Sequence, residues 1–269
     1  MTYAQFLLFF IVTPLVALGA AALPAYFRRS SQPGQVALWP GIAPVLALMG
    51  IATLYTMPWD DHLIALGVWW YRPSSLFGLY IGHVPLEEAL FFPLQTLLVG
   101  MWWLWLGGWA APVAGAIDTR TAHTRRGALG RSAVVAVGVA AWIGSLALLG
   151  AGWRAGTYVG WEIAWALPPL LLQALVGGDI LWRRRRLLGW VVIPVVVYLS
   201  CVDALAIHLG IWTIDRRQSL GLLIGARLPV EELLFFLVTS ALIGCGLVLG
   251  SATESRRRAR ALAGKLGGR

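Results

Sequence analysis

The sequence predicts an all-α, polytopic membrane protein with about seven transmembrane helices. Hydrophobic residues make up 59% of its 269 residues, whereas charged residues make up only 12%. Such a composition is typical of a chain that crosses a bilayer several times, because each crossing needs about 20 mostly apolar residues. An internal duplication further predicts two parallel three-helix repeats joined by a linking helix.

Seven apolar stretches are candidates for the membrane spans. The stretch at 157–182 is the least uniform, because it carries Glu162 and Asp179 near its ends. The first stretch has no Lys or Arg before it and no small-residue cleavage site, which a signal peptide would have. We therefore expect a retained helix. The predicted spans are 3–27, 36–57, 84–106, 132–150, 157–182, 188–210 and 229–250.

The positive charges predict the orientation of these spans. The net charge is +9, and 16 of the 21 Lys and Arg residues fall in the segments 28–35, 107–131 and 183–187 and in the C-terminal tail. The positive-inside rule then places the N-terminus outside and the C-terminus in the cytoplasm. The runs Arg183–Arg186 and Arg256–Arg258 are expected to face anionic membrane lipid, and no nucleic acid partner is expected.

Two sequence patterns occur twice. Pro-Leu-Glu-Glu-Ala-Leu-Phe-Phe at 85–92 returns as Pro-Val-Glu-Glu-Leu-Leu-Phe-Phe at 229–236, and Tyr-x4-Asp-x6-Gly-x-Trp starts at both Tyr55 and Tyr198. The offset is 143 for the second pattern and 144 for the first, so one residue was gained in the second loop. We therefore divide the chain into a first repeat (1–110), an inner loop with linking helix (111–156), a second repeat (157–250) and a basic cytoplasmic tail (251–269).

Paired carboxylates open an apolar stretch in each repeat. A charge near the centre of a membrane helix costs about 2.5–3.5 kcal/mol, so the duplication of such pairs indicates chemistry. Pro85 and Pro229 suit the first turn of a helix, which puts each glutamate pair beside the positive helix end. We expect one aspartate from the preceding helix of each repeat to join them. The candidate catalytic residues are Glu87, Glu88, Glu231, Glu232, Asp60 and Asp203.

Aromatic side chains accompany these acids at helical spacing. Each phenylalanine of the two Phe-Phe pairs follows a glutamate by four residues and so shares its helix face. Crowded acids share protons, and an aromatic face stabilises a cation. The combination suits a reaction that protonates a carbon–carbon double bond, shelters the carbocation and removes another proton. The candidate substrate contacts are Phe91, Phe92, Phe235, Phe236, Tyr55 and Tyr198.

Simpler interpretations of these residues stay open. First-turn carboxylates are often helix caps, Phe-Phe in a span often faces lipid, and Asp60 and Asp61 could end a helix at the interface. Cys201 and Cys245 show no metal-binding spacing and predict no disulfide. The four histidines are scattered along the chain, so no metal site is expected.

The duplicated Pro-x-Glu-Glu motif resembles that of the small integral-membrane lycopene cyclases. In that family the cyclase occurs as two short subunits or as both fused in one chain, and fungal cyclase–phytoene synthases carry a similar pair. Here the motif is matched by Pro85-Leu86-Glu87-Glu88 and Pro229-Val230-Glu231-Glu232, in a two-unit layout along nearly the whole chain.

The resemblance implies carotenoid biosynthesis by a lycopene β-cyclase of a bacterial or archaeal cell membrane. The linear ψ-ends of lycopene would close to β-ionone rings, giving γ- or β-carotene, in an isomerisation without redox change. Glu87 and Glu231 are the expected proton-transfer residues. Glu88 and Glu232 would share or tune the proton, and Asp60 and Asp203 would assist as bases or orienting groups.

The resemblance also bears on cofactors and partners. No Gly-x-Gly-x-x-Gly fingerprint is present, so neither a flavin nor a nicotinamide cofactor is expected. The expected partners are lycopene or a related linear carotenoid, membrane lipid and other carotenoid enzymes. Because parallel repeats put both acid clusters at one membrane face, we expect either one composite site or two sites that work in sequence.

Other functions remain open at this stage. A proton-coupled transporter also fits seven spans, parallel repeats and membrane carboxylates, and a structural or assembly protein would need no chemistry. The only lysine, Lys265, lies in the tail, which argues against a retinal protein. Within the family, a C50 carotenoid substrate, the ring type and the number of rings closed stay undecided.

Overall fold

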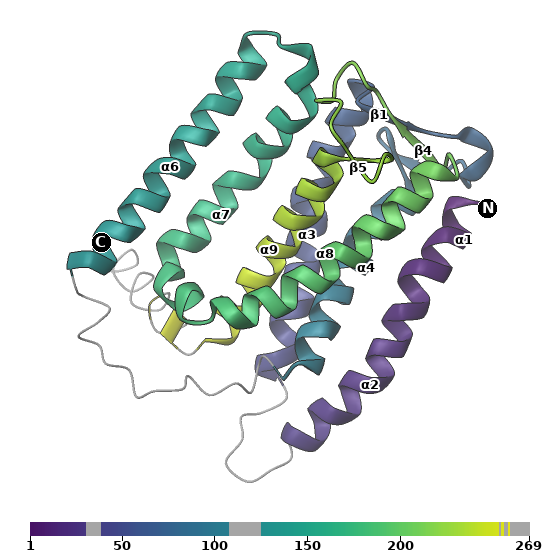
Figure 1. Cartoon of the computed structure of the whole chain (residues 1–269). Helices are drawn as coiled ribbons and strands as arrows, with labels where there is room; N and C mark the ends of the chain where they lie inside the picture. Colours follow the sequence, from purple (N-terminus) through teal and green to yellow (C-terminus); the bar gives the residue numbers. More distant parts are fainter. Residues whose placement is uncertain (31–38, 108–124, 253, 256–257, 259–269) are drawn as a thin grey trace.

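The computed structural model describes residues 1–30, 39–107, 125–252, 254–255 and 258. Long helices run side by side in an elongated bundle, and the N-terminus lies at the end that carries the short strands (Figure 1). The prediction of an all-α, polytopic membrane protein is confirmed. Among these described residues, five stretches are long and apolar enough to cross a membrane: Tyr3–Pro24, Gly41–Ala65, Arg154–Arg183, Arg185–His208 and Val230–Ser251.

The helices follow the predicted order. The first unit comprises α1 (Tyr3–Leu7), a π-helical turn (Leu8–Val12), α2 (Thr13–Ser30), α3 (Trp39–Ala65) and α4 (Leu86–Trp105). The linking helix is α6 (Arg125–Gly150). The second unit comprises α7 (Thr157–Arg183), α8 (Arg185–His208) and α9 (Val230–Ser251). Much of the predicted inner loop at 107–131 and of the basic tail at 251–269 lies outside the described residues.

One predicted boundary moves in a way that matters for function. The apolar stretch 36–57 ends before Pro58, but α3 continues through that proline to Ala65. Asp60 therefore lies inside the helix and is buried, rather than at its exposed end. The largest fully buried side chains include Trp103 of α4, Leu199 of α8 and Tyr3 of α1, so both units contribute to the core.

A short strand from each unit joins the two at one end of the bundle. Strand β1 (Trp69–Tyr71) pairs antiparallel with β4 (Trp212–Ile214), and Trp70 lies opposite Thr213. These strands are counterparts in the duplication, at the offset of 143. Each strand therefore pairs with its own equivalent, which relates the two units by an approximate two-fold axis through this ladder.

Each unit also carries a two-stranded hairpin just before its last helix. The first hairpin pairs β2 (Tyr80–Ile81) with β3 (Val84–Pro85), and the second pairs β5 (Leu223–Ile224) with β6 (Leu228–Pro229). The turn of the first hairpin has two residues, and the turn of the second hairpin has three, with Ala226 at φ 64°. The residue gained in the second unit therefore lies in this turn.

The duplicated glycines end the second helix of each unit. Gly67 and Gly210 adopt φ values of 69° and 63°. The N–H of the residue after each glycine bonds back to the helix, from Val68 to the Leu63 carbonyl and from Ile211 to the Ala206 carbonyl. This is the Schellman pattern, in which a left-handed residue favours glycine.

Prolines inside the membrane helices leave carbonyl groups without their usual partner, because proline has no N–H. Pro14 removes the donor four residues after Phe10, and the Tyr198 hydroxyl donates to the Phe10 carbonyl at 2.6 Å. At the equivalent place, the Tyr55 hydroxyl donates to the Trp165 carbonyl, four residues before Pro169, at 2.9 Å.

Tryptophans satisfy two further carbonyl groups of this kind. Trp142 Nε1 donates to the Ala164 carbonyl (3.0 Å), four residues before Pro168. Trp102 Nε1 donates to the Trp190 carbonyl (2.8 Å), four residues before Pro194. An unsatisfied backbone group in hydrocarbon costs several kcal/mol, so these donors make the prolines tolerable. The two tyrosines in addition tie each unit to the first helix of the other.

We expect Tyr198→Phe to destabilise the protein by about 1–3 kcal/mol, because it leaves the Phe10 carbonyl unsatisfied inside the bundle. The measurement is unfolding of the detergent-solubilised protein, followed by tryptophan fluorescence. Tyr80→Phe is the matched control, since Tyr80 is exposed on the first hairpin. Equal unfolding of the Tyr198→Phe variant and the wild-type protein would contradict this role.

Candidate active site

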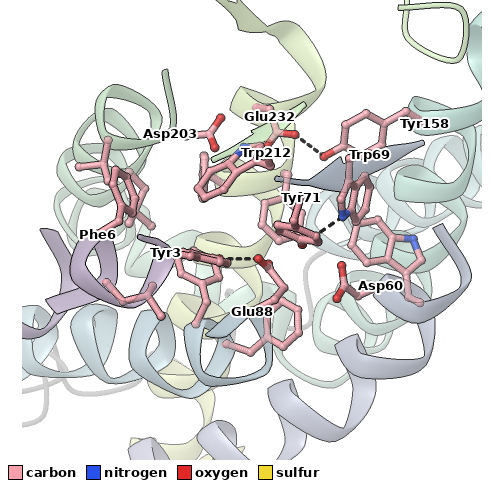
Figure 2. Close-up of a pocket in the computed structure, with 18 residues that line it drawn as sticks. Tyr3, Phe6, Asp60, Trp69, Tyr71, Glu88, Tyr158, Asp203, Trp212 and Glu232 are labelled. Atoms are coloured by element: carbon pink, nitrogen blue, oxygen red, sulfur yellow. Dashed lines mark hydrogen bonds between the residues drawn. The ribbon is translucent and has the colours of Figure 1, made fainter. Parts of the chain in front are cut away.

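A cavity of about 60 Å³ lies at the strand-bearing end of the bundle, and we call it the chamber. Both units line it, with residues from the first helix, the second helix and the third helix of each unit. Four carboxyl groups, two from each unit, contribute to its wall (Figure 2). They belong to Asp60, Glu88, Asp203 and Glu232.

The two glutamates of the chamber each accept a hydrogen bond from a buried tyrosine. The Tyr3 hydroxyl donates to Glu88, and the Tyr158 hydroxyl donates to Glu232 Oε1 at 2.9 Å. Both tyrosines follow a threonine at the start of the first helix of their unit. The N-terminus of α1 is therefore part of the site, because it delivers Tyr3.

The two aspartates complete the acid cluster. Asp60 and Asp203 are 1% and 3% exposed, and one oxygen of each has no hydrogen-bond partner among the described residues. Each aspartate lies close enough to both Glu88 and Glu232 for charge interaction. Four carboxyl groups gathered around one small cavity cannot all be ionised without a large cost in free energy, and groups in this situation titrate together.

A third phenol comes from strand β1. Burial, followed in size by the nearby Glu88, holds the pKa of Tyr71 well above its ordinary value. The phenol therefore stays neutral and keeps its proton for hydrogen bonding. Trp69 Nε1 donates to the Tyr71 oxygen at 3.2 Å, which leaves the Tyr71 proton directed to another acceptor.

Aromatic rings form the rest of the chamber wall. All four phenylalanines of the Phe-Phe pairs line it. Trp59 stacks on Trp165 with ring centroids 4.6 Å apart, and on Phe235 at 5.7 Å with nearly parallel planes. Ring faces of this kind stabilise a cation by roughly 0.5–2 kcal/mol each, without acting as nucleophiles.

The first glutamate of each pair lies elsewhere. Glu87 and Glu231 are fully buried but do not line the chamber. Oxygen Oε1 of Glu87 accepts the backbone N–H of Phe77 at 2.6 Å, and Oε1 of Glu231 accepts that of Leu220 at 2.6 Å. These glutamates therefore fasten the connecting loop of each unit to the start of the following helix.

The prolines of the motif precede the helices rather than entering them. Pro85 and Pro229 are the N-cap residues of α4 and α9, and each ends a strand. The expected first-turn position of the prolines is therefore off by one residue. The glutamates do occupy the first turn, so the strand–helix junction aims the second glutamate of each pair into the chamber.

A second cavity, of about 150 Å³, adjoins the chamber, and we call it the groove. It shares Phe92 and Phe235 with the chamber wall and extends between α3, α4, α7 and α9. The Tyr55 ring lines it, while the Tyr55 hydroxyl is held by the Trp165 carbonyl. At its wall, Gln95 Nε2 donates to Thr239 Oγ1 at 2.9 Å, a bond between the two units.

The equivalent cavity of the other unit has about 210 Å³ and is separate from the chamber. It is lined by Pro14, Leu18, Leu98, Trp102, Pro194, Val195 and Tyr198, and it shares none of these with the chamber wall. Tyr55 and Tyr198 thus line cavities outside the chamber, on opposite sides of the bundle axis. Only the groove on the Tyr55 side continues from the acid cluster.

Several site residues had no clear sequence signal. Tyr3 and Tyr158 are counterparts, but their offset is 155 rather than 143, because the first unit has a longer connection between its first two helices. The repeated dipeptide Thr-Tyr was the available signal. Within the described residues, no three His, Cys, Asp or Glu side chains are arranged to hold a metal ion.

The comparisons with known proteins agree with this architecture. A family model described as lycopene cyclase matches residues 1–106 and 157–247. The lycopene β-cyclase of Halobacterium salinarum is 40% identical over 96% of this chain and 99% of its own length. No solved structure matches the chain significantly.

Longer fungal proteins match over part of their length. The bifunctional lycopene cyclase/phytoene synthases of Podospora anserina and Aspergillus niger are 31% and 33% identical, over 76% of this chain and 34% of theirs. The family match covers both units, and the archaeal relative matches from end to end. The chain therefore belongs to the lycopene cyclase family.

Proposed function

We propose that this protein is a lycopene β-cyclase that closes the linear ψ-ends of lycopene to β-ionone rings. The chamber carries this proposal, because four carboxyl groups from both units face an aromatic wall there; Asp60, Asp203 and Glu232 are buried and Glu88 is partly buried. The family membership and the archaeal β-cyclase relative support the same activity. The reaction is an isomerisation, so proton donors and acceptors suffice for it.

The reaction needs one proton delivered and one removed. Protonation at C2 of the end group creates a tertiary cation at C1, the C5–C6 double bond attacks that cation, and loss of the C6 proton gives the β-ring. Glu88 and Glu232 suit these transfers because they line the chamber. We therefore assign proton transfer to this pair, with Asp60 and Asp203 assisting, whereas Glu87 and Glu231 hold the fold together.

The groove suits the polyene chain of the substrate. It opens toward the lipid-facing surface at Ile51, which is 61% exposed, and it joins the chamber beside Phe92 and Phe235. A linear carotenoid in the bilayer would thus place one end group among the carboxyl groups while its chain lies along α3, α7 and α9. One chamber of this size handles the two ends of lycopene in turn.

The charge distribution supports an orientation in the cell membrane with the N-terminus outside and the C-terminus in the cytoplasm. The chamber then lies at the outer end of the spans, below strands β1 and β4. The substrate arrives from the lipid phase, and membrane lipid surrounds the bundle. Association with other carotenoid enzymes would shorten the path of lycopene to the groove.

We expect Glu88→Gln and Glu232→Gln each to lower cyclisation by about 100-fold or more, because each removes one proton-transfer group. The measurement is pigment analysis by HPLC in a lycopene-accumulating bacterial host. Glu87→Gln and Glu231→Gln are the matched controls, which lower protein stability but retain measurable cyclisation per folded molecule. Full activity of either chamber variant would contradict the assignment.

Cyclisation in D₂O tests the chemistry itself. The proton added at C2 comes from an exchangeable carboxyl group, so each ring closed in D₂O is expected to carry one deuterium at that carbon. Mass spectrometry of the product detects it, and lycopene recovered from the same sample serves as the control. A product without deuterium would contradict proton-initiated cyclisation.

Blocking the groove is expected to impair substrate binding. Ile51→Trp adds bulk at its lipid-facing edge and is expected to raise the KM for lycopene several-fold, with little change in protein stability. Ile193→Trp is the matched control, because Ile193 is 62% exposed and lines none of the cavities described above. Identical kinetics for the two variants would show that the polyene lies elsewhere.

A further inference from the structure

The two halves of the chamber are chemically different around their matched glutamates. Glu88 has two phenols beside it, from Tyr3 and Tyr71. Glu232 has one phenol, from Tyr158, and lies close to an additional carboxyl group, Glu162. Phenols donate hydrogen bonds that favour a carboxylate, whereas a neighbouring acid disfavours a second negative charge.

Glu162 is an unusual residue for a membrane helix. It lies one turn after Tyr158 on α7 and is completely buried, with 0% exposure. Neither of its carboxyl oxygens has a hydrogen-bond partner among the described residues, and the same is true of Oε2 of neighbouring Glu231. An isolated buried carboxylate is very costly, so this group carries a proton or shares one with the glutamates of α9.

The duplication shows that each of these two differences is present in only one half. Leu7 occupies the place equivalent to Glu162, one turn after Tyr3. Ile214 occupies the place equivalent to Tyr71, at the offset of 143. The first half therefore has an extra hydrogen-bond donor, and the second half has an extra acid. Nothing in the symmetric packing of the bundle requires either.

We infer that the two halves divide the roles: Glu232 is the proton donor to C2, Glu88 is the base that removes the C6 proton, and Glu162 is a positioning residue that keeps a proton on Glu232. This inference rests on the proposed cyclase function. It assigns opposite proton-transfer roles to two glutamates that occupy equivalent positions in the duplication.

The proton balance of this assignment closes over one ring. The bond between the proton and Glu232 breaks as the new C2–H bond forms. The C5–C6 electron pair then forms the bond to C1, and the C6–H electron pair restores the C5–C6 double bond as Glu88 takes the proton. Asp60 and Asp203, which interact with both glutamates, provide the route by which the proton returns to Glu232.

Few charged groups other than these acids surround Glu162. On its own helix the titratable neighbour is Tyr158, and α9 contributes Glu231 and Glu232. His62 of α3 packs against Trp161, and Arg154 before α7 pairs with Asp215 at 3.9 Å. The described side chains of α6, from 134 to 150, include no charged residue. No cation described here neutralises Glu162.

The test is the pH dependence of the initial cyclisation rate of the full-length protein in liposomes, with lycopene as the probe. Glu162→Leu introduces the residue found in the other half, which favours correct folding. We expect a rate at least about tenfold lower at pH 7 and an alkaline limb moved to lower pH by about 1 unit. Glu162→Gln, which is neutral and of similar shape, is expected to move the same limb in the same direction.

Leu7→Glu is the reciprocal variant. It adds an acid beside the base half, so it is expected to move the acidic limb to higher pH and to leave the alkaline limb in place. Unmoved limbs in both Glu162 variants, or movement of the alkaline limb by Leu7→Glu, would overturn the division of roles. Failure of the wild-type protein to cyclise lycopene would instead refute the proposed function.

Discussion

The cost of burying carboxyl groups in a membrane protein is the constraint on which the rest of this structure depends. Asp60, Glu88, Asp203 and Glu232 are gathered in one small, aromatic-lined space. Each needs either a hydrogen-bond donor or a shared proton. The first-turn positions on α4 and α9, the tyrosines at the start of the first helix of each unit and the strand ladder all serve that need.

The approximate two-fold symmetry brings matched residues of both units together around one chamber. The ladder between β1 and β4 and the bonds from Tyr55 and Tyr198 hold each unit against the other. The second helix of each unit is thereby hydrogen-bonded to the first helix of the other unit. Because the chamber wall is drawn from both units, neither unit encloses the acid cluster alone. The symmetry also gives the groove an equivalent cavity in the other unit, but of these two only the groove continues from the chamber.

Much of this arrangement could be predicted from the sequence. Hydrophobic stretches gave the helices, and the duplicated motifs placed the glutamates and phenylalanines at one end of the bundle. Which glutamate faces the chamber could not be predicted from the motif, because both glutamates of each pair lie in the first helical turn and adjacent side chains on a helix point about 100° apart. That orientation is set by the connecting loops before the hairpins, where the Phe77 and Leu220 N–H groups donate to the first glutamate of each pair.

The roles of other residues could not be predicted from the sequence, for different physical reasons. Tyr3 and Tyr158 escaped the comparison of repeats because the connection after the first helix differs in length. Tyr55 and Tyr198 recur in the two repeats, but the sequence alone does not show that their hydroxyls donate to the carbonyl groups left without a partner by Pro169 and Pro14. Glu162 stood out only as an irregularity in an apolar stretch, since its neighbours on α9 are distant in sequence.

We propose that one composite chamber holds the reacting end group between Glu88 and Glu232. The most direct test of this proposal is a cryo-electron microscopy structure of the Glu232→Gln variant with lycopene bound. We expect the end group to lie in the chamber, with a reacting carbon about 3.5 Å from each of the two side chains and the polyene in the groove. An end group bound within one unit, away from either residue, would contradict it.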